Sequence, residues 1–300
     1  MKKIKILAVF IIFINEIQAQ ISNYNHYPSL KPFHILDDKL TDISFAFSMR
    51  VLESDYNGPL IRLRRSSDNA EEDFSWSDND IVDINAINTW RNGSNVFVRT
   101  WYDQSGQGRN ATQTDINSQP EFFPEILTPH FQGDGVDDFL IIETPNGVQD
   151  VTNSGNQGTV ITVLRATIKN QHSFGVLNNN NRWSTHVNWS DSRLYFDPGI
   201  CCNATRSFNN SSNNNAWMLY TFIKTDTNVL ARSDGVERFN GSHTTGRCTR
   251  TDNFTIGWAN GNQTNNRSTT AFLEFIMYRN DIIPTIYEEI ENNGIAFWNL

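Results

Sequence analysis

Short apolar runs bounded by Asn, Asp, Gly and Ser recur along the chain, and this pattern constrains the fold more than any other feature. Such runs predict β-strands joined by polar turns, whereas helical periodicity is scarce. We therefore expect an all-β protein. The expected strands are 60–64, 96–102, 139–142, 159–166, 192–196, 216–224, 229–233, 254–258 and 269–279.

Two of these segments indicate how the strands are layered. Residues 270–278 are apolar on both faces apart from Glu274, and residues 216–223 are also apolar on both faces. A strand of this kind lies between two packed layers, so the sequence predicts a two-sheet β-sandwich. We expect short helices at 43–52, 84–90 and 284–297, the last one packing against the sandwich.

The first residues have the layout of a secretory signal peptide. Lys2, Lys3 and Lys5 precede an uncharged apolar run at 6–14, and Ala19 marks a cleavage point. The run is shorter than the about 20 residues that span a bilayer. We expect residues 1–19 to be removed and the protein to be secreted, extracellular or periplasmic, or held at the cell surface, without membrane insertion.

The charge of the chain limits the partners that we expect, and its cysteines suggest a disulfide bond. The chain has 33 acidic and 24 basic residues, a net charge of −9. Because affinity for nucleic acid comes from neutralising phosphates, we expect no nucleic-acid partner. In an oxidising compartment we expect one disulfide bond, from Cys248 to Cys202 or Cys201, because adjacent cysteines rarely pair with each other.

Two stretches carry a family resemblance. Residues 56–70 read YNGPLIRLRRSSDNA, and residues 100–113 read TWYDQSGQGRNATQ. Together they resemble the catalytic domain of the α-L-arabinofuranosidase B family of glycoside hydrolases. Residues 131–140, FQGDGVDDFL, look like the entry to the jelly-roll module of laminin-G-like and concanavalin-like domains.

The resemblance implies both a fold and a substrate class. It implies that residues 20–300 form one concanavalin A-like β-sandwich, with the family motifs in 20–130 and a jelly-roll core in 131–300. It also implies a protein that acts on or binds arabinose-containing or similar polysaccharide.

The second motif has a structural interpretation as well. Asp103 and Ser105 are suited to capping backbone donors in a tight turn, and Gly106 and Gly108 permit positive φ. A role for Asp103 as an acid would require a partner carboxylate. We expect a structural role for the motif residues Tyr102, Asp103, Gln104, Ser105, Gly106 and Gly108.

Hydrolysis of a glycoside requires two carboxyl groups. The resemblance places the family's nucleophile near 194–199, where this chain has Asp197, and the family's acid near 257–260, where it has Asn260. Glu274 is a second candidate, because a charge in a strand that is apolar on both faces must be paired if it is buried. An arginine such as Arg193 or Arg279 would instead give it a structural role, so catalysis by Asp197 and Glu274 stays open.

Aromatic and acidic residues suggest binding sites. Trp183, Trp189 and Trp258, with Asn260, lie beside Asn-rich segments and suit the apolar face and hydroxyl groups of a sugar, although core packing is the alternative for each ring. Asp134, Asp137 and Asp138 form either a calcium site or a polar turn. We expect no required cofactor.

Three functions remain open from the sequence. The first is a carbohydrate-active protein resembling arabinofuranosidase B. The second is a non-catalytic carbohydrate-binding or adhesion module of laminin-G-like fold, and the third is a structural surface protein. The sequence does not predict the oligomeric state.

Overall fold

Strand β19 (Ala271–Tyr278) lies within one sheet of the protein, and all eight of its residues are buried. It pairs antiparallel with β9 (Gly158–Arg165) and with β1 (Ile43–Ser48). Burial on both faces is the environment predicted for this segment.

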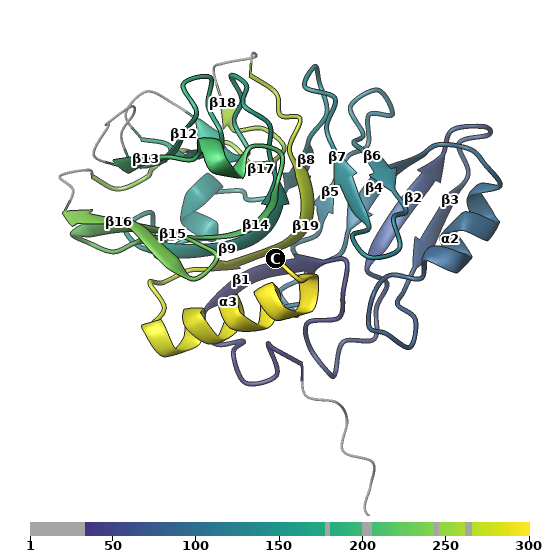
Figure 1. Ribbon diagram of the computed structural model, residues 1–300, viewed down its shortest axis with the longest axis horizontal. Coiled ribbons are helices and arrows are strands. Elements are labelled where there is room, and N and C mark those ends of the chain that lie inside the picture. Colours follow the sequence, from purple (N-terminus) through teal and green to yellow (C-terminus); the bar gives the residue numbers. More distant parts are fainter. Residues whose placement is uncertain (1–33, 178–180, 200–205, 243–245, 262–265) are drawn as a thin grey trace, which may run out of the picture. The chain divides into compact units, whose positions relative to one another are not determined.

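The computed structural model describes residues 34–177, 181–199, 206–242, 246–261 and 266–300 (Figure 1).

The first sheet of the sandwich has the order β16–β15–β14–β9–β19–β1, and all of these neighbours are antiparallel. Its other strands are β14 (Trp217–Lys224), β15 (Asn228–Ser233) and β16 (Val236–Ser242). Phe222 pairs with Val160, and Ile161 pairs with Ile276. This register gathers large apolar side chains in the middle of the sheet.

The second sheet has the order β13–β12–β11–β10–β17–β8–β5, again antiparallel. Strand β18 adds a parallel pairing to β10. The strands are β5 (Ala111–Thr112), β8 (Leu140–Ile142), β10 (Phe174–Leu177), β11 (Trp183–His186), β12 (Arg193–Pro198), β13 (Ser207–Asn209), β17 (Phe254–Ile256) and β18 (Asn260–Gly261).

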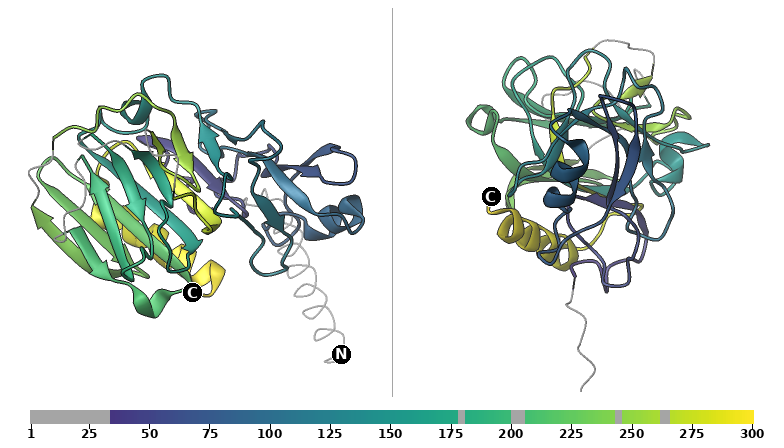
Figure 2. Two further views of the ribbon diagram at one scale, coloured as in Figure 1. Left: turned by 90° about the horizontal axis from the view of Figure 1, so that it is seen from above. Right: turned by 90° about the vertical axis from the view of Figure 1, so that its right-hand side faces the viewer.

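The two sheets pack face to face (Figure 2). Aromatic rings from both sheets meet between them. Phe174 of β10 meets Phe275 of β19 edge-on, with ring centroids 4.8 Å apart. Phe196 of β12 lies 5.3 Å from Phe222 of β14. Aromatic pairs of this geometry add about 0.5–1.5 kcal/mol each beyond the area that they bury. The predicted concanavalin A-like, two-sheet all-β sandwich is confirmed.

The N-terminal strands form an extension that is hydrogen-bonded to both sheets. Its order is β3–β2–β4–β6–β7, with β7 paired to β19 and β5 joining β4 to β8. The strands are β2 (Ile61–Arg65), β3 (Glu71–Phe74), β4 (Val96–Trp101), β6 (Glu121–Phe123) and β7 (His130–Gln132). Residues 34–300 pack as one unit, whereas the predicted signal peptide lies outside the described residues.

Helices are few and short among the described residues. Helix α2 (Ile84–Arg91) begins after Asp83, whose carboxylate accepts the Ala86 N–H at 2.9 Å. Two turns of 3-10 helix, η1 (Gly147–Asp150) and η3 (Ser211–Asn213), lie in connections. Within the described part of the chain, no helix is both long enough and apolar enough to cross a membrane.

Helix α3 (Pro284–Trp298) lies against the outer face of the first sheet (Figure 1). It starts with a proline in its first turn, as predicted. Tyr287, Ile290 and Trp298 are buried on its inner side. Gly294 permits the close approach, because a Cβ there would lie 2.7 Å from the Leu219 side chain.

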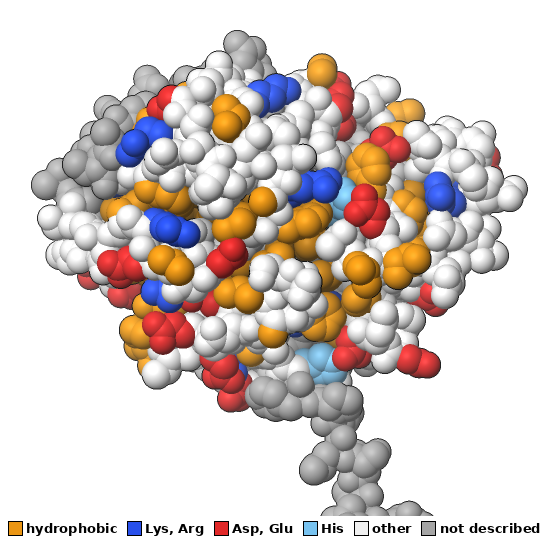
Figure 3. Space-filling view, viewed as in Figure 1, with side chains coloured by type: hydrophobic (Ala, Val, Ile, Leu, Met, Phe, Trp, Pro, Cys, Tyr) orange, Lys and Arg blue, Asp and Glu red, His pale blue; other side chains and the backbone are white. Residues whose placement is uncertain are grey.

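On the face displayed in Figure 3, acidic and basic side chains are interspersed around a band of hydrophobic ones.

The predicted helix at 43–52 is wrong. Residues 43–48 form β1, whose six residues are all buried and which pairs with β19. Phe45 packs against Phe254 and Phe275, both 5.9 Å away between ring centroids. Ile43, Phe45, Phe47 and Met49 alternate with Ser44, Ala46, Ser48 and Arg50, which is the period-2 pattern of a strand and argues against a helix. Pairing with β19 then fixes this strand in the sheet.

The motif that follows β4 is a hydrogen-bonded clamp. Asp103 Oδ1 accepts the backbone N–H groups of Ala46 and Ser105, both at 2.9 Å, and Oδ2 accepts the N–H of Arg109 at 2.9 Å. Gly106 and Gly108 take φ values of 79° and 72°, which close the turn. Asp103 therefore has the structural role predicted for it.

Gln104 extends the clamp to the chain after β1. Its Oε1 accepts the Leu52 N–H at 2.8 Å, and its Nε2 donates to the Arg50 carbonyl at 2.9 Å. Its own backbone N–H donates to the Ala46 carbonyl at 2.8 Å. The motif thus fixes β1 against the N-terminal extension, while the Tyr102 hydroxyl donates to exposed Asp73 at 2.7 Å.

We predict that Asp103→Asn destabilises the protein by about 1–3 kcal/mol. An amide cannot accept all three backbone N–H groups, because its NH2 group meets at least one of them donor to donor. Urea unfolding monitored by tryptophan fluorescence measures the change. Asp78→Asn, at an exposed position, is the matched control. Equal stability of Asp103→Asn and the control would show that the clamp is dispensable.

Candidate binding site on the outer face of the second sheet

Polar side chains gather on the outer face of β11 and β12. Ser184 pairs with Asp197 and His186 pairs with Tyr195, so these four side chains share one face of the sheet. Phe196, which lies between Tyr195 and Asp197 in β12, points the other way and packs between the sheets. Strand alternation therefore places a polar row on the face that points away from the apolar core, where Ser184, His186 and Asp197 are themselves buried.

Asp197 is the charged centre of this row. Its side chain is 1% exposed. Its Oδ1 accepts from Arg206 Nη2 at 3.0 Å, and its Oδ2 lies 3.5 Å from His186 Nε2 and 3.7 Å from Arg182 Nη1. Burial lowers the pKa of Arg182, and the Asp197 carboxylate opposes that shift. Asp197 therefore acts as a counter-ion for two guanidinium groups.

Three rings lie beside the carboxylate. His172 and His186 have ring centroids 4.3 Å apart, and Trp189 meets His186 edge-on at 4.9 Å. Among the described residues, neither Ser184 Oγ nor His186 Nδ1 has a hydrogen-bond partner, although both atoms are buried. A group with hydroxyls that reached this face would find a donor or acceptor at each of these atoms.

The loop that holds Trp189 is built on Asn188. Asn188 takes a left-handed conformation with φ of 56°, and its side chain donates to the Ala166 carbonyl at 2.7 Å. Asn210 Nδ2 in turn donates to Asn188 Oδ1 at 2.7 Å and to the Tyr220 hydroxyl at 2.8 Å. This buried network fixes the half-exposed Trp189 at the end of the β11–β12 hairpin.

The structure corrects two of the predicted sugar-binding tryptophans. Trp183 is fully buried and packs edge-on against Phe196 at 5.6 Å, because its place in β11 points it into the sandwich. Trp258 is also buried, with the Arg267 guanidinium 3.4 Å above its ring. Asn260 is half-buried and donates to the Asn253 carbonyl at 3.2 Å. Of the three tryptophans, Trp189 keeps the surface position expected of a sugar platform.

Glu274 is sealed beneath α3. Arg50 Nε donates to its Oε2 at 2.7 Å, and Arg50 Nη2 donates to its Oε1 at 3.1 Å. Ser48 Oγ and Trp298 Nε1 donate to Oε2 at 3.0 and 3.3 Å. Arginine supplies the structural pairing, but the partner is Arg50 rather than Arg193 or Arg279, and no sequence pattern marked it.

The two candidate catalytic carboxylates are not brought together. Asp197 lies on the outer face of the second sheet, and Glu274 lies between the first sheet and α3. Glycoside hydrolysis requires two carboxyl groups that face each other across the scissile bond. Asp197 and Glu274 do not meet this requirement.

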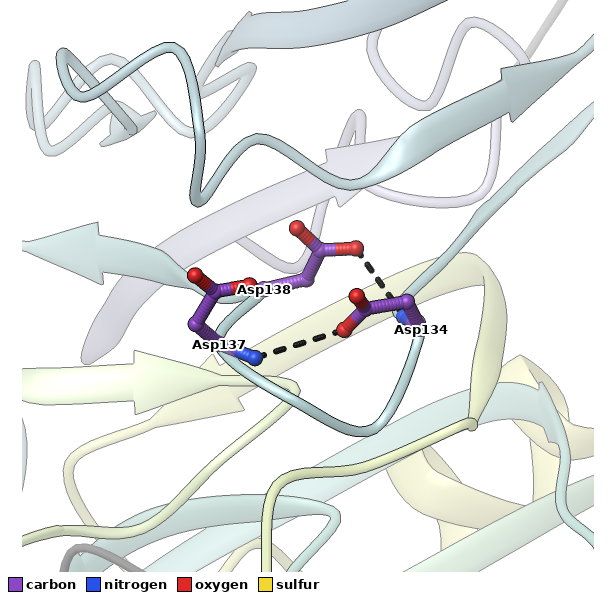
Figure 4. A group of neighbouring side chains, drawn as sticks. All are labelled: Asp134, Asp137 and Asp138. Carbon is purple, nitrogen blue, oxygen red and sulfur yellow. Dashed lines mark hydrogen bonds between the residues drawn. The ribbon is translucent and has the colours of Figure 1, made fainter.

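Asp134, Asp137 and Asp138 form a turn before β8 (Figure 4). Their carboxylate oxygens lie within 4.8 Å of one another. Asp138 Oδ2 accepts the Asp134 N–H at 2.9 Å, and Asp134 Oδ1 accepts the Val136 N–H at 2.7 Å. Burial, with the charges of Asp134 and Asp137, raises the pKa of Asp138 to about 7. The turn offers hard oxygen ligands, but three carboxylates alone supply few of the about 6–8 that Ca²⁺ takes.

The predicted disulfide bond between Cys202 and Cys248 is not formed. Cys248 carries a free thiol that is fully buried, and burial raises its pKa to about 12. Its backbone N–H donates to the Gly155 carbonyl at 3.0 Å, which fixes the segment against the connection before β9. Cys201 and Cys202 lie outside the described residues.

The two-sheet sandwich is of the concanavalin A-like type. Sequence comparison names a family that the chain resembles. Residues 33–122 match the sequence model of the family described as alpha-L-arabinofuranosidase B, catalytic. The resemblance predicted from residues 56–70 and 100–113 is confirmed. No curated protein matches the chain.

Solved arabinofuranosidases share the fold. An arabinofuranosidase complexed with arabinofuranosyl-alpha-1,2-xylobiose has a TM-score of 0.67 at 14% identity, covering 88% of this chain and 65% of that one. A GH54 α-L-arabinofuranosidase soaked with a cyclic sulfate inhibitor gives 0.63 at 14% identity, covering 85% of this chain and 63% of that one. The chain thus spans slightly less than two thirds of these structures' length. At this identity the likeness shows the fold alone.

We predict that Glu274→Gln destabilises the protein by about 3–5 kcal/mol, because it leaves the buried Arg50 guanidinium without its counter-charge. Chemical denaturation measures the change, and Glu288→Gln on the exposed side of α3 is the control, with an expected loss of about 0–1 kcal/mol. The double variant Arg50→Met with Glu274→Leu should recover much of the loss. An unchanged midpoint for Glu274→Gln would contradict the structural role.

We predict that Asp138 makes stability depend on pH. Its folded pKa of about 7 exceeds the ordinary value of 3.8, so the folded protein holds this proton more tightly than the unfolded chain. The stability that the proton provides is complete below pH 3.8 and is lost as pH rises to about 7. Asp138→Asn should therefore raise Tm at pH 8 relative to wild type, with little gain at pH 4.

Thermal unfolding at the two pH values checks this expectation, with Asp78→Asn as the control. The same measurement with CaCl2 or EDTA tests the predicted cation site. An equal effect of Asp138→Asn on Tm at pH 8 and pH 4 would show that Asp138 does not titrate between them.

Proposed function

We propose that this is an exported carbohydrate-active protein that binds an arabinose-containing glycan on the outer face of β11 and β12. The observation that carries the proposal is the polar row of Ser184, His186, Tyr195 and Asp197 beside half-exposed Trp189. The family match of residues 33–122 and the shared fold support the choice of glycan.

The chemistry of the outer face suits a sugar. A buried hydroxyl or ring nitrogen without a hydrogen-bond partner costs about 1–3 kcal/mol, so Ser184 Oγ and His186 Nδ1 favour a ligand that brings hydroxyl groups. The Trp189 ring offers an apolar surface to the C–H face of a sugar. The paired charges of Asp197, Arg182 and Arg206 hold the polar row in place.

Binding is favoured over hydrolysis because of the carboxylates. Asp197 is buried and paired with arginine, and Glu274 is sealed under α3. Hydrolysis of an arabinofuranoside is the second candidate. It is favoured by the matching region, 33–122, and by the fold shared with structures described as arabinofuranosidases.

Export is supported by the sequence of residues 2–19, with its basic start, apolar run and small residue at Ala19. A secreted or surface location would place the protein where polysaccharides occur. N-terminal sequencing of the mature protein tests this part, with a start at Gln20 as the expected result.

We predict that Trp189→Ala weakens binding of α-1,5-linked arabinotriose by about tenfold, equivalent to about 1.4 kcal/mol, because the variant removes the ring that contacts the sugar. Isothermal titration calorimetry of the full chain measures the affinity. Trp76→Ala, another half-buried tryptophan, is the matched control and should bind as wild type. Equal affinities for both variants would contradict this site.

Hydrolysis is tested in parallel with 4-nitrophenyl α-L-arabinofuranoside. We expect no release of nitrophenol above the spontaneous rate. Release by wild type that disappears in Asp197→Asn, while circular dichroism shows that the variant is still folded at the assay temperature, would favour the enzyme over the binding protein.

A further inference from the structure

We propose that a pocket in the N-terminal extension, remote from the β11–β12 face in the strand order, binds a neutral sugar unit of the same glycan. The pocket encloses about 340 Å³ and is formed by β4, β6, β7 and the turn before β8. This volume lies in the range of about 300–1,000 Å³ that is usual for small-ligand pockets. The inference rests on the proposed glycan-binding function but uses different residues.

The pocket is built on one cross-strand row. Arg64 of β2 pairs with Phe97 of β4, Phe97 pairs with Glu121 of β6, and Glu121 pairs with Gln132 of β7. Directly paired residues of antiparallel strands point to the same face. A ring, a carboxylate and an amide therefore stand side by side in the pocket, and the strand register fixes their order.

Aromatic rings form the apolar part of the lining. Phe97 and Phe123 are half-buried and both line the pocket. The Arg64 guanidinium lies 4.8 Å from the Phe97 ring, and His130 stacks on Phe123 at 5.1 Å. Because neighbours already hold the rings in place, little conformational entropy is lost when a sugar packs against them.

The floor of the pocket is rigid. Arg64 Nε donates to Gln119 Oε1 at 2.5 Å, and Arg64 Nη1 donates to Asn69 Oδ1 at 2.8 Å. Gln119 Nε2 donates to the Gln113 carbonyl at 2.9 Å. The buried arginine is thus held by neutral oxygen atoms, and these donors are not free to bind an anion.

The polar groups of the row are open to a ligand. Within the described part of the chain, the side chains of Glu121 and Gln132 make no hydrogen bond, although both line the pocket. The Glu121 carboxylate offers hydrogen-bond acceptors, and the Gln132 amide on the adjacent strand offers both a donor and an acceptor. Two such groups side by side can bind neighbouring hydroxyl groups of one sugar ring.

The charge of the pocket selects the ligand class. Glu121, Asp134 and Asp138 line it, against the single guanidinium of Arg64. This excess of carboxylates disfavours uronic acids and sulfated sugars, because like charges repel in a partly buried site. A neutral pentose or hexose unit carries no such penalty.

The test separates this pocket from the outer-face site. Calorimetric titration of the full chain with α-1,5-linked arabinotriose should show two binding events, and Trp189→Ala should weaken one of them about tenfold and leave the other unchanged. Adding Glu121→Ala and Gln132→Ala to Trp189→Ala should abolish the event that Trp189→Ala leaves unchanged. Gln107→Ala, at an exposed position, is the matched control for the amide. Trigalacturonate should bind the Trp189→Ala protein at least tenfold more weakly than arabinotriose.

Each result decides between the two sites. If Trp189→Ala alone removes all binding, the pocket proposal is overturned while the proposed function stands. If the Glu121→Ala/Gln132→Ala variant removes all binding and Trp189→Ala none, the pocket stands and the outer-face site falls. If wild type does not bind arabinotriose, the pocket proposal is overturned. It is also overturned if titrations show that the pocket binds Ca²⁺ but no sugar. Thermal unfolding of each variant verifies that it is folded.

Discussion

The carboxylate of Asp103 is the contact on which the arrangement of the chain depends. It accepts three backbone N–H groups, one from β1 and two from its own turn. The side chain of the neighbouring Gln104 forms hydrogen bonds with the backbone of Arg50 and Leu52, in the segment that follows β1. These bonds fix β1 against the turn that follows β4 and so attach the N-terminal extension to the sandwich. The most specific family motif is therefore a structural joint, which explains why it identifies a fold more readily than an activity.

Buried arginine–carboxylate pairs occur on the outer faces of both sheets. Glu274 with Arg50 fastens α3 to the first sheet, and Asp197 with Arg206 lies on the outer face of the second sheet. Removing one member of such a pair is costly, because the other charge stays buried. Both carboxylates that the sequence offered for catalysis are thereby committed to structural pairs. The proposed sugar site therefore relies on hydroxyl and aromatic groups rather than on these two carboxylates.

Much of the fold was predictable, and the reason lies in local pattern. Strands such as β14 and β19 carry apolar side chains on both faces, a pattern that few environments other than a packed sheet satisfy. Helix α3 was recognisable from Pro284 and its inward isoleucines. The helix expected at 43–52 was wrong because the alternation of Ser44, Ala46 and Ser48 with large apolar residues is the period-2 pattern of a strand, and it was overlooked. The roles of Trp183 and Trp258 were misjudged because proximity to polar loops does not reveal the direction of a side chain.

The sequence by itself determined the all-β class, strongly apolar strands such as β9, β14 and β19, the family resemblance of the N-terminal region and the capping role of Asp103. These follow from local periodicity and from hydrogen bonds that mostly join residues close in the sequence. The tertiary structure decided which charges meet and which rings are exposed. Arg50 reaches Glu274 across 224 residues, and the row of Phe97, Glu121 and Gln132 exists only through strand register. Contacts between distant segments depend on chain topology, and no local pattern of residues encodes them.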